Sequence, residues 1–483
     1  MTLLGRGQAP ATTTAAPATE HRDPRWLAPA FALFTVVATV KLGVRAVSDP
    51  DTWWHLKTGE LVLHGGAFAG PDPWVPASTR PFVLTQWLPE VVAAKANELA
   101  GLPGVAWLRC AAMLALLGAL VWACRRVADS VPAVIAAIAA LVGTGGSLSE
   151  RPQLVSFVLL AVTVGAWWRT ADDLRPRWWL VPLTWVWACS HGLWSVGPVV
   201  GVVFVAGLVL DRRVGRAAAL RLLLVPALSV VVAALTPVGP RLLLTPFEVG
   251  STASRFVQEW QPTTVSNVFA VVVLVMVATT VLVWVRSGRP TSWLSLLLAA
   301  ASVVSALTML RTVAVGAILA APLLAGALQG LRSARPTRAG RREVLVWVAA
   351  LVVAAAVAMP VCGQVAARPS GVPTGLSAPL SALPKGTVVL DDFAQSGWLL
   401  WSQPQLVPVI DLRSEIYDPA YIDAYRQAQA ARPGWQQFVH HTGARVAVLE
   451  TRSPLALALR EELGWRITAS TARFSLLEAP TTG

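Results

Sequence analysis

Charged residues and cysteines are scarce in this 483-residue chain. Only 13% of the residues are charged, whereas 55% are hydrophobic and the mean hydropathy is +0.59. This composition excludes a soluble globular protein, because large apolar patches would face water. The four cysteines lie in apolar stretches without CxxC or His/Cys ligand spacing, which predicts buried thiols and neither a disulfide framework nor a zinc site. They are Cys110, Cys124, Cys189 and Cys362.

The positive charge of the chain is distributed in a way that argues against nucleic-acid binding. The formal net charge is +13, but the arginines cluster in short segments between apolar runs, and no basic face with interleaved aromatic residues is visible. Such placement is typical of membrane topology signals, and the 22 tryptophans fit belts at the membrane interfaces. Membrane lipids are therefore expected partners, and nucleic acids are not.

About eleven apolar runs follow an N-terminal segment rich in Ala, Thr and Pro. We expect residues 1–25 to be disordered and not to be a signal peptide, because the first apolar run is long enough to span and lacks a small-residue cleavage site. A membrane-spanning helix needs roughly 20 residues. The sequence therefore predicts a mainly α-helical, polytopic membrane protein. Its spans are expected at 26–47, 103–124, 130–147, 152–168, 177–190, 192–210, 218–236, 266–285, 292–309, 312–330 and 343–362.

The arginines also predict the orientation of these spans. With residues 1–25 in the cytoplasm, arginine-rich connections such as 125–126 and 212–216 fall inside, and connections with few basic residues fall outside. The alternation holds at every crossing, and an odd number of spans leaves the C-terminal tail outside. The transmembrane domain is thus expected to cover residues 26–365, with a long first outer loop at 48–102.

From about residue 369 the composition becomes that of a soluble domain. Segments with strand character alternate with helical segments between residues 387 and 478, which predicts a small, mostly parallel α/β domain. We expect this extracytoplasmic domain to occupy residues 370–483. Within it, Asp411, Arg413 and Glu415 are expected either to bind a sugar or to form a salt-bridged loop.

The most informative motif follows the first apolar run and reads Asp-Pro-Asp-Thr-Trp-Trp-His-Leu-Lys-Thr-Gly from residue 49 to residue 59. Two acids and a histidine beside a membrane are costly unless they have a function or a partner. Asp51 and His55 are four residues apart, so they share one face of a helix. Short amphipathic helices are predicted at 51–63 and 85–99, lying in the membrane interface.

Further unusual polar residues lie far apart in the sequence but all at the outer ends of predicted spans. Together with the motif they predict the polar centre of a membrane-embedded active site. They are Arg151, Gln153, His191, Glu259 and Arg311.

The sequence leaves structural alternatives open for the motif residues. Asp49 suits a helix N-cap, and Asp51 could pair with Lys57 or Arg151. His55 could be a packed, hydrogen-bonded residue. Asp49, Asp51 and His55 could also hold a divalent cation.

Structural alternatives are open for the basic residues as well. Arg151 and Arg311 could anchor helix ends by snorkelling towards the interface. His191, followed by a glycine, could mark a tight break between two spans.

The pattern resembles GT-C type glycosyltransferases. A long first outer loop with acids after span one, interfacial helices, many spans and an outer α/β tail are shared with that superfamily. More narrowly, the chain is similar to a group of bacterial polytopic proteins with the motifs D-x-W-W-H-L-x-T-G (here 51–59), R-P-Q (151–153), W-x-x-x-H-G (187–192), E-W (259–260) and D-x-R-x-x-x-Y (411–417). The resemblance covers nearly the whole chain after residue 25.

The resemblance implies a membrane enzyme of the cell envelope. Such enzymes take a sugar from a polyprenyl-phosphate carrier and pass it, with inversion, to a glycan, lipid or protein acceptor at the outer face of the cytoplasmic membrane. An acid of the first outer loop serves as general base. By position this is Asp51, then Asp49, with His55 in the same catalytic group. Cations are expected to stabilise the lipid phosphate that leaves.

The substrate-binding residues that the resemblance implies are Arg151, Gln153, His191, Glu259 and Arg311. No cofactor is implied, although a divalent cation is possible at the acids. Two other functions stay open: a transporter or flippase of a lipid-linked intermediate, and a non-catalytic envelope scaffold. The polar residues gather at the outer ends of the spans, and no duplicated halves are visible, which favours chemistry at one surface over passage through the membrane.

Overall fold

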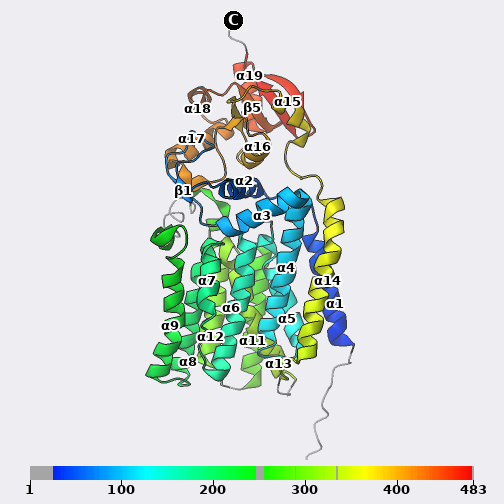
Figure 1. Cartoon of the computed structure of the whole chain (residues 1–483), viewed down its shortest axis with the longest axis vertical. Helices are drawn as coiled ribbons and strands as arrows, with labels where there is room; N and C mark the ends of the chain where they lie inside the picture. Colours follow the sequence, from blue (N-terminus) through cyan, green and yellow to red (C-terminus); the bar gives the residue numbers. More distant parts are fainter. Residues whose placement is uncertain (1–25, 246–254, 289, 333–335, 481–483) are drawn as a thin grey trace, which may run out of the picture.

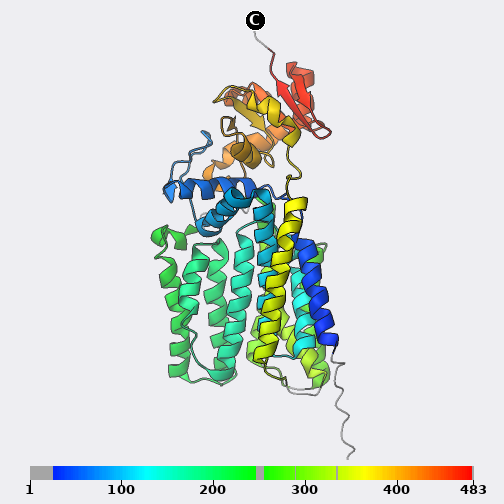
Figure 2. The same cartoon turned by 45° about the vertical axis from the view of Figure 1, so that its right-hand side comes forward.

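The computed structural model describes residues 26–245, 255–288, 290–332 and 336–480. Figure 1 shows three layers along the long axis: a helical bundle, two helices lying across one end of it, and a domain with a β-sheet beyond them. The same layers are visible after rotation in Figure 2. The segment 1–25, which was expected to be disordered, lies outside the described residues.

The bundle contains one helix for each predicted apolar run. Seven helical segments in the described part of the chain are long and apolar enough to cross a membrane, which makes this a multi-pass membrane protein. Helices α1, α5, α7 and α12 are shorter, so the total of eleven spans stays a prediction. The bundle helices are α1 (Leu27–Gly43), α4 (Leu102–Cys124), α5 (Ser130–Gly143), α6 (Gln153–Asp173), α7 (Leu180–Ala188), α8 (Val196–Leu210), α9 (Arg216–Ala233), α11 (Val268–Ser287), α12 (Trp293–Thr308), α13 (Val313–Gly330) and α14 (Arg341–Val365).

Burial differs sharply among these helices. Helix α13 is buried along almost its whole length, while α14 packs at the edge of the bundle beside α1 and leaves most of its apolar side chains exposed (Figures 1 and 2). Apolar side chains on the outer surface of a bundle are favourable only where lipid replaces water. The exposed face of α14 therefore agrees with a membrane environment.

The layer across the end of the bundle consists of α2 (Thr52–Leu63) and α3 (Trp87–Ala100), close to the bounds predicted for the two interfacial helices. The helices touch at Gly59, where a Cβ atom would lie 2.1 Å from the backbone oxygen of Glu90. Only glycine allows this approach. Between the helices, the short strands β1 (Ala69–Gly70) and β2 (Phe82–Val83) pair antiparallel.

The soluble domain contains a five-stranded sheet in the order β4-β3-β5-β7-β6. The prediction of a mostly parallel sheet was wrong, because only the β4–β3 and β3–β5 pairs are parallel. Strands β6 and β7 are joined by three residues, too few for the crossover that parallel pairing requires. The elements are α15 (Ser377–Ser381), β3 (Val388–Asp391), α16 (Ser396–Ser402), β4 (Val407–Pro408), α17 (Pro419–Gln429), α18 (Trp435–Thr442), β5 (Val446–Glu450), α19 (Pro454–Leu463), β6 (Arg466–Ser470) and β7 (Phe474–Glu478).

A buried arginine connects the soluble domain to the first loop. Arg413 pairs with Asp411 in its own domain and, at 2.6 Å, with Asp72 of the loop, and none of these three side chains is exposed. Its guanidinium also lies over the rings of Trp74 and Phe82, 4.8 and 4.5 Å from their centroids. Of the two roles considered for Asp411 and Arg413, these contacts favour the salt-bridged loop.

Candidate active site at the domain-facing end of the bundle

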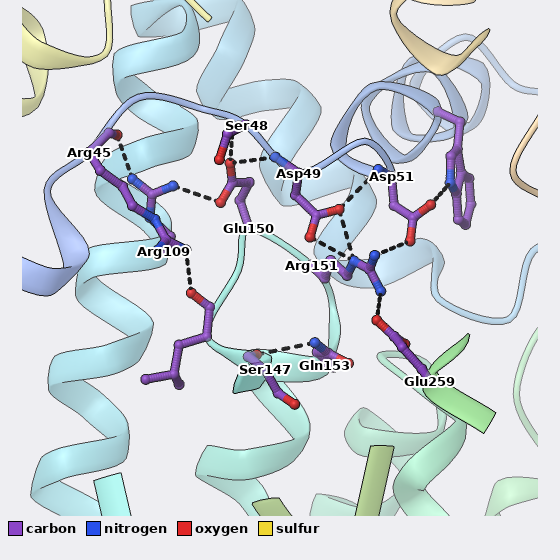
Figure 3. Close-up of polar contacts among 12 residues, drawn as sticks. Arg45, Ser48, Asp49, Asp51, Arg109, Ser147, Glu150, Arg151, Gln153 and Glu259 are labelled. Carbon is purple, nitrogen blue, oxygen red and sulfur yellow. Dashed lines mark hydrogen bonds and ion pairs between the residues drawn. The ribbon is translucent and has the colours of Figure 1, made fainter. Parts of the chain in front are cut away.

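Arg151 lies at the centre of an ion-pair cluster where the bundle meets α2 (Figure 3). Its Nε donates to both oxygens of Asp49 at 2.9 Å, its Nη2 pairs with Asp51 Oδ2 at 2.8 Å, and its Nη1 pairs with Glu259. Burial lowers the pKa of Arg151, but the three carboxylates outweigh burial and raise it. Three predicted site residues, Asp49, Asp51 and Glu259, thus contact a fourth, Arg151. The ion pair between Asp51 and Arg151, which the sequence left open as a structural alternative, is present.

The two acids of the motif have different surroundings. Asp49 Oδ1 also accepts a hydrogen bond from the backbone N–H of Asp51 at 2.9 Å, so this side chain fixes the entry into α2. Asp51 accepts from Trp54 Nε1 at 3.1 Å and lines a polar cavity. Each carboxylate oxygen of Asp51 has one partner and keeps a lone pair for another donor. Of the two acids, Asp51 is the one that lines this cavity.

The residue before Arg151 holds the backbone of the same motif (Figure 3). Glu150 Oε1 accepts from the N–H groups of Ser48 and Asp49 at 2.7 and 3.3 Å, and Glu150 Oε2 pairs with Arg109 at 2.6 Å. Arg109 donates in addition to the carbonyl oxygens of Gly43, Arg45 and Ala46. The consecutive residues Glu150 and Arg151 thus fix the backbone and the side chain of Asp49, respectively.

Helix α2 orients the remaining motif residues in opposite directions. Trp53 is fully buried, with its ring 5.2 Å from that of Trp401 in the soluble domain. His55 points towards α3, where its Nδ1 lies 2.7 Å from Oε1 of the buried Glu90. Burial raises the pKa of Glu90 although the contact with His55 lowers it. Nδ1 of His55 is thus occupied by Glu90, which leaves Nε2 for another partner.

Arg311 has surroundings unlike those of Arg151. Its Nη2 lies 2.6 Å from His191 Nε2, and its guanidinium lies over the ring of Trp260, 5.5 Å from the centroid. No carboxylate of the described residues lies within ion-pair distance of it. A guanidinium can only donate, so His191 Nε2 accepts and Nδ1 carries the hydrogen, which it donates to Ser156 Oγ at 3.0 Å. The 3.3 Å contact of Leu193 N–H with that nitrogen is then not a hydrogen bond.

Two adjoining hollows meet at these residues. An apolar cleft of about 460 Å³ lies between α3, α4, α6 and α7, with Leu88, Leu108 and Val155 in its wall. A polar cavity of about 300 Å³ lies beside it and is lined by Asp51, Gln153, His191, Glu259 and Arg311. His55 and Arg151 line both. Seven of the eight predicted site residues therefore line the polar cavity, and Asp49 lies behind it.

Three residues of this site were not predicted as catalytic or substrate-binding residues from the sequence: Glu90, Arg109 and Glu150. Arg109 lies inside an apolar run, and a charge at such a position is itself a sign of buried pairing. Glu90 looked like the polar side of an amphipathic helix, and only the packing of α2 on α3 buries it. Glu415, for which sugar binding or a salt-bridged loop was expected, lines the cavity from the soluble domain.

The three residues considered as cation ligands face different partners. In residues 26–245, 255–288, 290–332 and 336–480, no group of three or more His, Cys, Asp or Glu side chains is placed to hold a metal ion. Asp49 and Asp51 both face Arg151, whereas His55 faces Glu90.

Comparisons with known proteins find similarity in structure but not in sequence. No family model matches the chain, and no curated protein matches it. The apo oligosaccharyltransferase of Archaeoglobus fulgidus superposes with a TM-score of 0.59 at 11% identity, over 88% of this chain and 70% of that one. The oligosaccharyltransferase AglB of the same organism, in complex with an inhibitory peptide and a dolichol-phosphate, gives 0.55 at 12% identity, over 95% and 76%.

A third superposition extends over almost the whole length of both chains. ArnT from Cupriavidus metallidurans, bound to undecaprenyl phosphate, superposes with a TM-score of 0.51 at 16% identity, over 95% of this chain and 98% of that one. Identities this low establish the fold alone. The layered bundle, the helices across its end and the terminal domain with a β-sheet are thus the architecture of the GT-C glycosyltransferases, and this chain has the GT-C fold.

Proposed function

We propose that the protein is a membrane glycosyltransferase that moves a sugar from a polyprenyl-phosphate donor to an envelope acceptor. One observation carries this proposal: the apolar cleft and the polar cavity adjoin at His55 and Arg151. A lipid-linked sugar is divided in the same way, with a hydrocarbon tail, a phosphate and a polar ring. The cleft suits the tail, and the cavity suits the phosphate and the sugar.

Charge balance supports Arg311 as the main cation for the donor phosphate. The charge of Arg151 is already compensated by three carboxylates, whereas Arg311 has only neutral partners among the described residues. An anion entering the cavity would gain a charge-assisted hydrogen bond from Arg311. His55 Nε2, at the junction of cleft and cavity, supports a second contact with that phosphate.

Asp51 is the proposed general base. In the reaction, the acceptor hydroxyl oxygen attacks the anomeric carbon of the donor sugar, and the bond from that carbon to the phosphate oxygen breaks. The hydroxyl proton passes to Asp51, and the lipid phosphate leaves with the electron pair near Arg311. Attack opposite to the leaving phosphate inverts the anomeric carbon.

The proposed location is the bacterial cytoplasmic membrane, with residues 1–25 inside and the soluble domain outside. The arginine-rich connections support this orientation, because Arg125 and Arg126 directly follow α4, and Arg212 and Arg213 follow α8. The C-terminal ends of these two helices lie away from the soluble domain (Figure 1). The protein would then meet its acceptor, which is a glycan, a lipid or a protein, at the outer face of the membrane.

The test uses the purified protein in lipid nanodiscs with a panel of polyprenyl-phosphate sugars. Donor consumption and binding are followed for wild type, for Asp51→Asn, and for Glu98→Gln, a control at an exposed position on α3. We expect consumption by wild type and the control, and retained binding with loss of consumption for Asp51→Asn. Binding without consumption by wild type would favour a transporter or flippase. A wild type that binds no donor would favour a non-catalytic scaffold.

A further inference from the structure

A segment of the soluble domain closes one side of the polar cavity. Residues 412–415 line it opposite helix ends of the bundle and the α2 motif. They belong to the D-x-R-x-x-x-Y motif, and the structure assigns a contact to each motif residue. Arg413 pairs with Asp411 and Asp72, and the Tyr417 hydroxyl accepts from the backbone N–H of Asp411 at 3.0 Å.

The position of this segment is fixed from both sides. The backbone oxygen of Ile416 accepts from the N–H groups of Thr79 and Arg80 in the first loop, at 2.9 and 3.0 Å. Arg413 on the other side is completely buried. Glu415 lies between these two anchored residues, so its backbone is held in place at the edge of the cavity.

The Glu415 carboxylate itself is left for a ligand. No other side chain of the described residues forms a hydrogen bond or an ion pair with it, although it lines the cavity that contains Asp51 and Glu259. Burial is the largest effect on its pKa and raises it, whereas the residue's own backbone N–H and the charge of Arg413 lower the pKa, and the carboxylates of Asp411 and Asp51 raise it. The side chain is half-buried, so its carboxylate can meet a ligand that enters the cavity.

We propose that Glu415 binds hydroxyl groups of a sugar ring in the polar cavity, so that the soluble domain contributes to sugar specificity. The proposal rests on the proposed function. A carboxyl group accepts hydrogen bonds from sugar hydroxyls in either protonation state, whereas a phosphate would be repelled and would move to Arg311. The sugar whose hydroxyl groups Glu415 binds is either the donor sugar or a sugar of the acceptor.

The test measures ligand protection of a cysteine at position 415. The four native cysteines are buried, so in Glu415→Cys a polar methanethiosulfonate reagent should label only the new thiol. Labelling is followed by mass spectrometry in nanodiscs with undecaprenyl phosphate, with undecaprenyl-phosphate sugars, or with methyl glycosides. Glu461→Cys, at an exposed position on α19, is the control and should react equally in all samples.

Two outcomes would support the proposal and distinguish the sources of the sugar. Protection by a sugar-bearing lipid, but not by undecaprenyl phosphate, would assign Glu415 to the donor sugar. Protection by methyl glycosides with the donor already bound would assign it to the acceptor sugar. In turnover assays, Glu415→Ala should raise the KM for that substrate by about 10- to 100-fold, as for a lost hydrogen bond to a charged group, while Glu415→Gln should keep part of the affinity.

One outcome would overturn it. If the lipids bind but neither lipids nor glycosides change labelling at position 415, Glu415 does not face a sugar. Binding of each lipid is measured separately by native mass spectrometry. Failure of every lipid to bind would refute the proposed function, and the glycoside samples would still test Glu415 by themselves.

Discussion

Replacing Arg109 by methionine should destabilise the protein more than replacing its partner Glu150 by glutamine. The Arg109–Glu150 pair is almost completely buried, with side-chain exposures of 0% and 1%. Arg109→Met would leave the Glu150 carboxylate without its counter-charge. It would also remove the donors that serve three carbonyl oxygens between residues 43 and 46.

The magnitudes follow from what each variant leaves unpaired. Breaking a buried ion pair by removal of one partner costs about 3–5 kcal/mol. Glu150→Gln keeps an oxygen that can accept from the Ser48 N–H, and Arg109 keeps its three carbonyl partners. It loses the charge assistance of one hydrogen bond, which is worth about 1.5–3 kcal/mol. Arg109→Met combined with Glu150→Met should cost less than the sum of the two single methionine variants, because no charge remains buried.

The free energy of unfolding is measured by SDS titration in mixed micelles, with fluorescence of the 22 tryptophans as the signal. Arg473→Met is the matched control, because the Arg473–Glu450 pair has side-chain exposures of 58% and 41%. An exposed pair of this kind contributes about 0–1 kcal/mol. Equal losses for Arg109→Met and Arg473→Met, or a larger loss for Glu150→Gln than for Arg109→Met, would refute this account of the Arg109–Glu150 pair.

Three further changes have expected results. Arg311→Gln should weaken undecaprenyl phosphate binding by about 10- to 100-fold in native mass spectrometry, through loss of a charge-assisted hydrogen bond, whereas Arg286→Gln, exposed at the other end of the bundle, should not. Arg413→Met should leave two buried acids unpaired, at a cost of about 3–5 kcal/mol, and release the soluble domain to limited proteolysis; unchanged resistance would contradict this. Burial raises the pKa of Asp391 well above its ordinary value. The stability that Asp391 contributes is therefore present below about pH 3.9 and is lost as pH rises through the folded-state pKa. In pulse proteolysis, the free energy of unfolding should fall less steeply with rising pH for Asp391→Asn than for wild type. Equal slopes for the two proteins would argue against this account.

The bundle could be predicted from the sequence because a spanning helix is a local signal. An apolar run of sufficient length specifies a helix whatever its neighbours are, since the backbone must satisfy its own hydrogen bonds in lipid. The bounds of α4 and α9 follow from such runs. The strand pairing in the sheet of the soluble domain was harder to predict, because the direction in which two strands pair depends on contacts between distant parts of the sequence. The three-residue link between β6 and β7 was nevertheless a local sign of a hairpin.

The site could be predicted in part for a related reason. Topology collects the polar ends of many spans at one surface, and this brought Asp51, Arg151, His191 and Arg311 into one prediction. Topology does not determine which side chains touch, so the contacts of Asp49 with Arg151 and Glu150 could not be predicted from the sequence. The Glu90–His55 contact depends on Gly59, because a larger residue would hold α2 away from α3. The glycine of the motif thus has a packing role that its sequence position alone did not indicate.

The two arginines of the cavity show why charge balance carries more weight than residue type. Arg151 lies just before α6 and Arg311 lies in a 3₁₀ turn just before α13, and both were expected to bind the substrate. Arg151 has three carboxylates within ion-pair distance, so an added anion would compete with existing partners and meet their repulsion. Arg311 contacts a neutral histidine and an aromatic ring, and the charges of Glu259, Asp51 and Glu415 act on it only from beyond ion-pair distance. Because no described residue places a counter-charge in direct contact with Arg311, an entering anion would be the first to do so. The same side chain therefore organises the site at one position and suits an anionic ligand at the other.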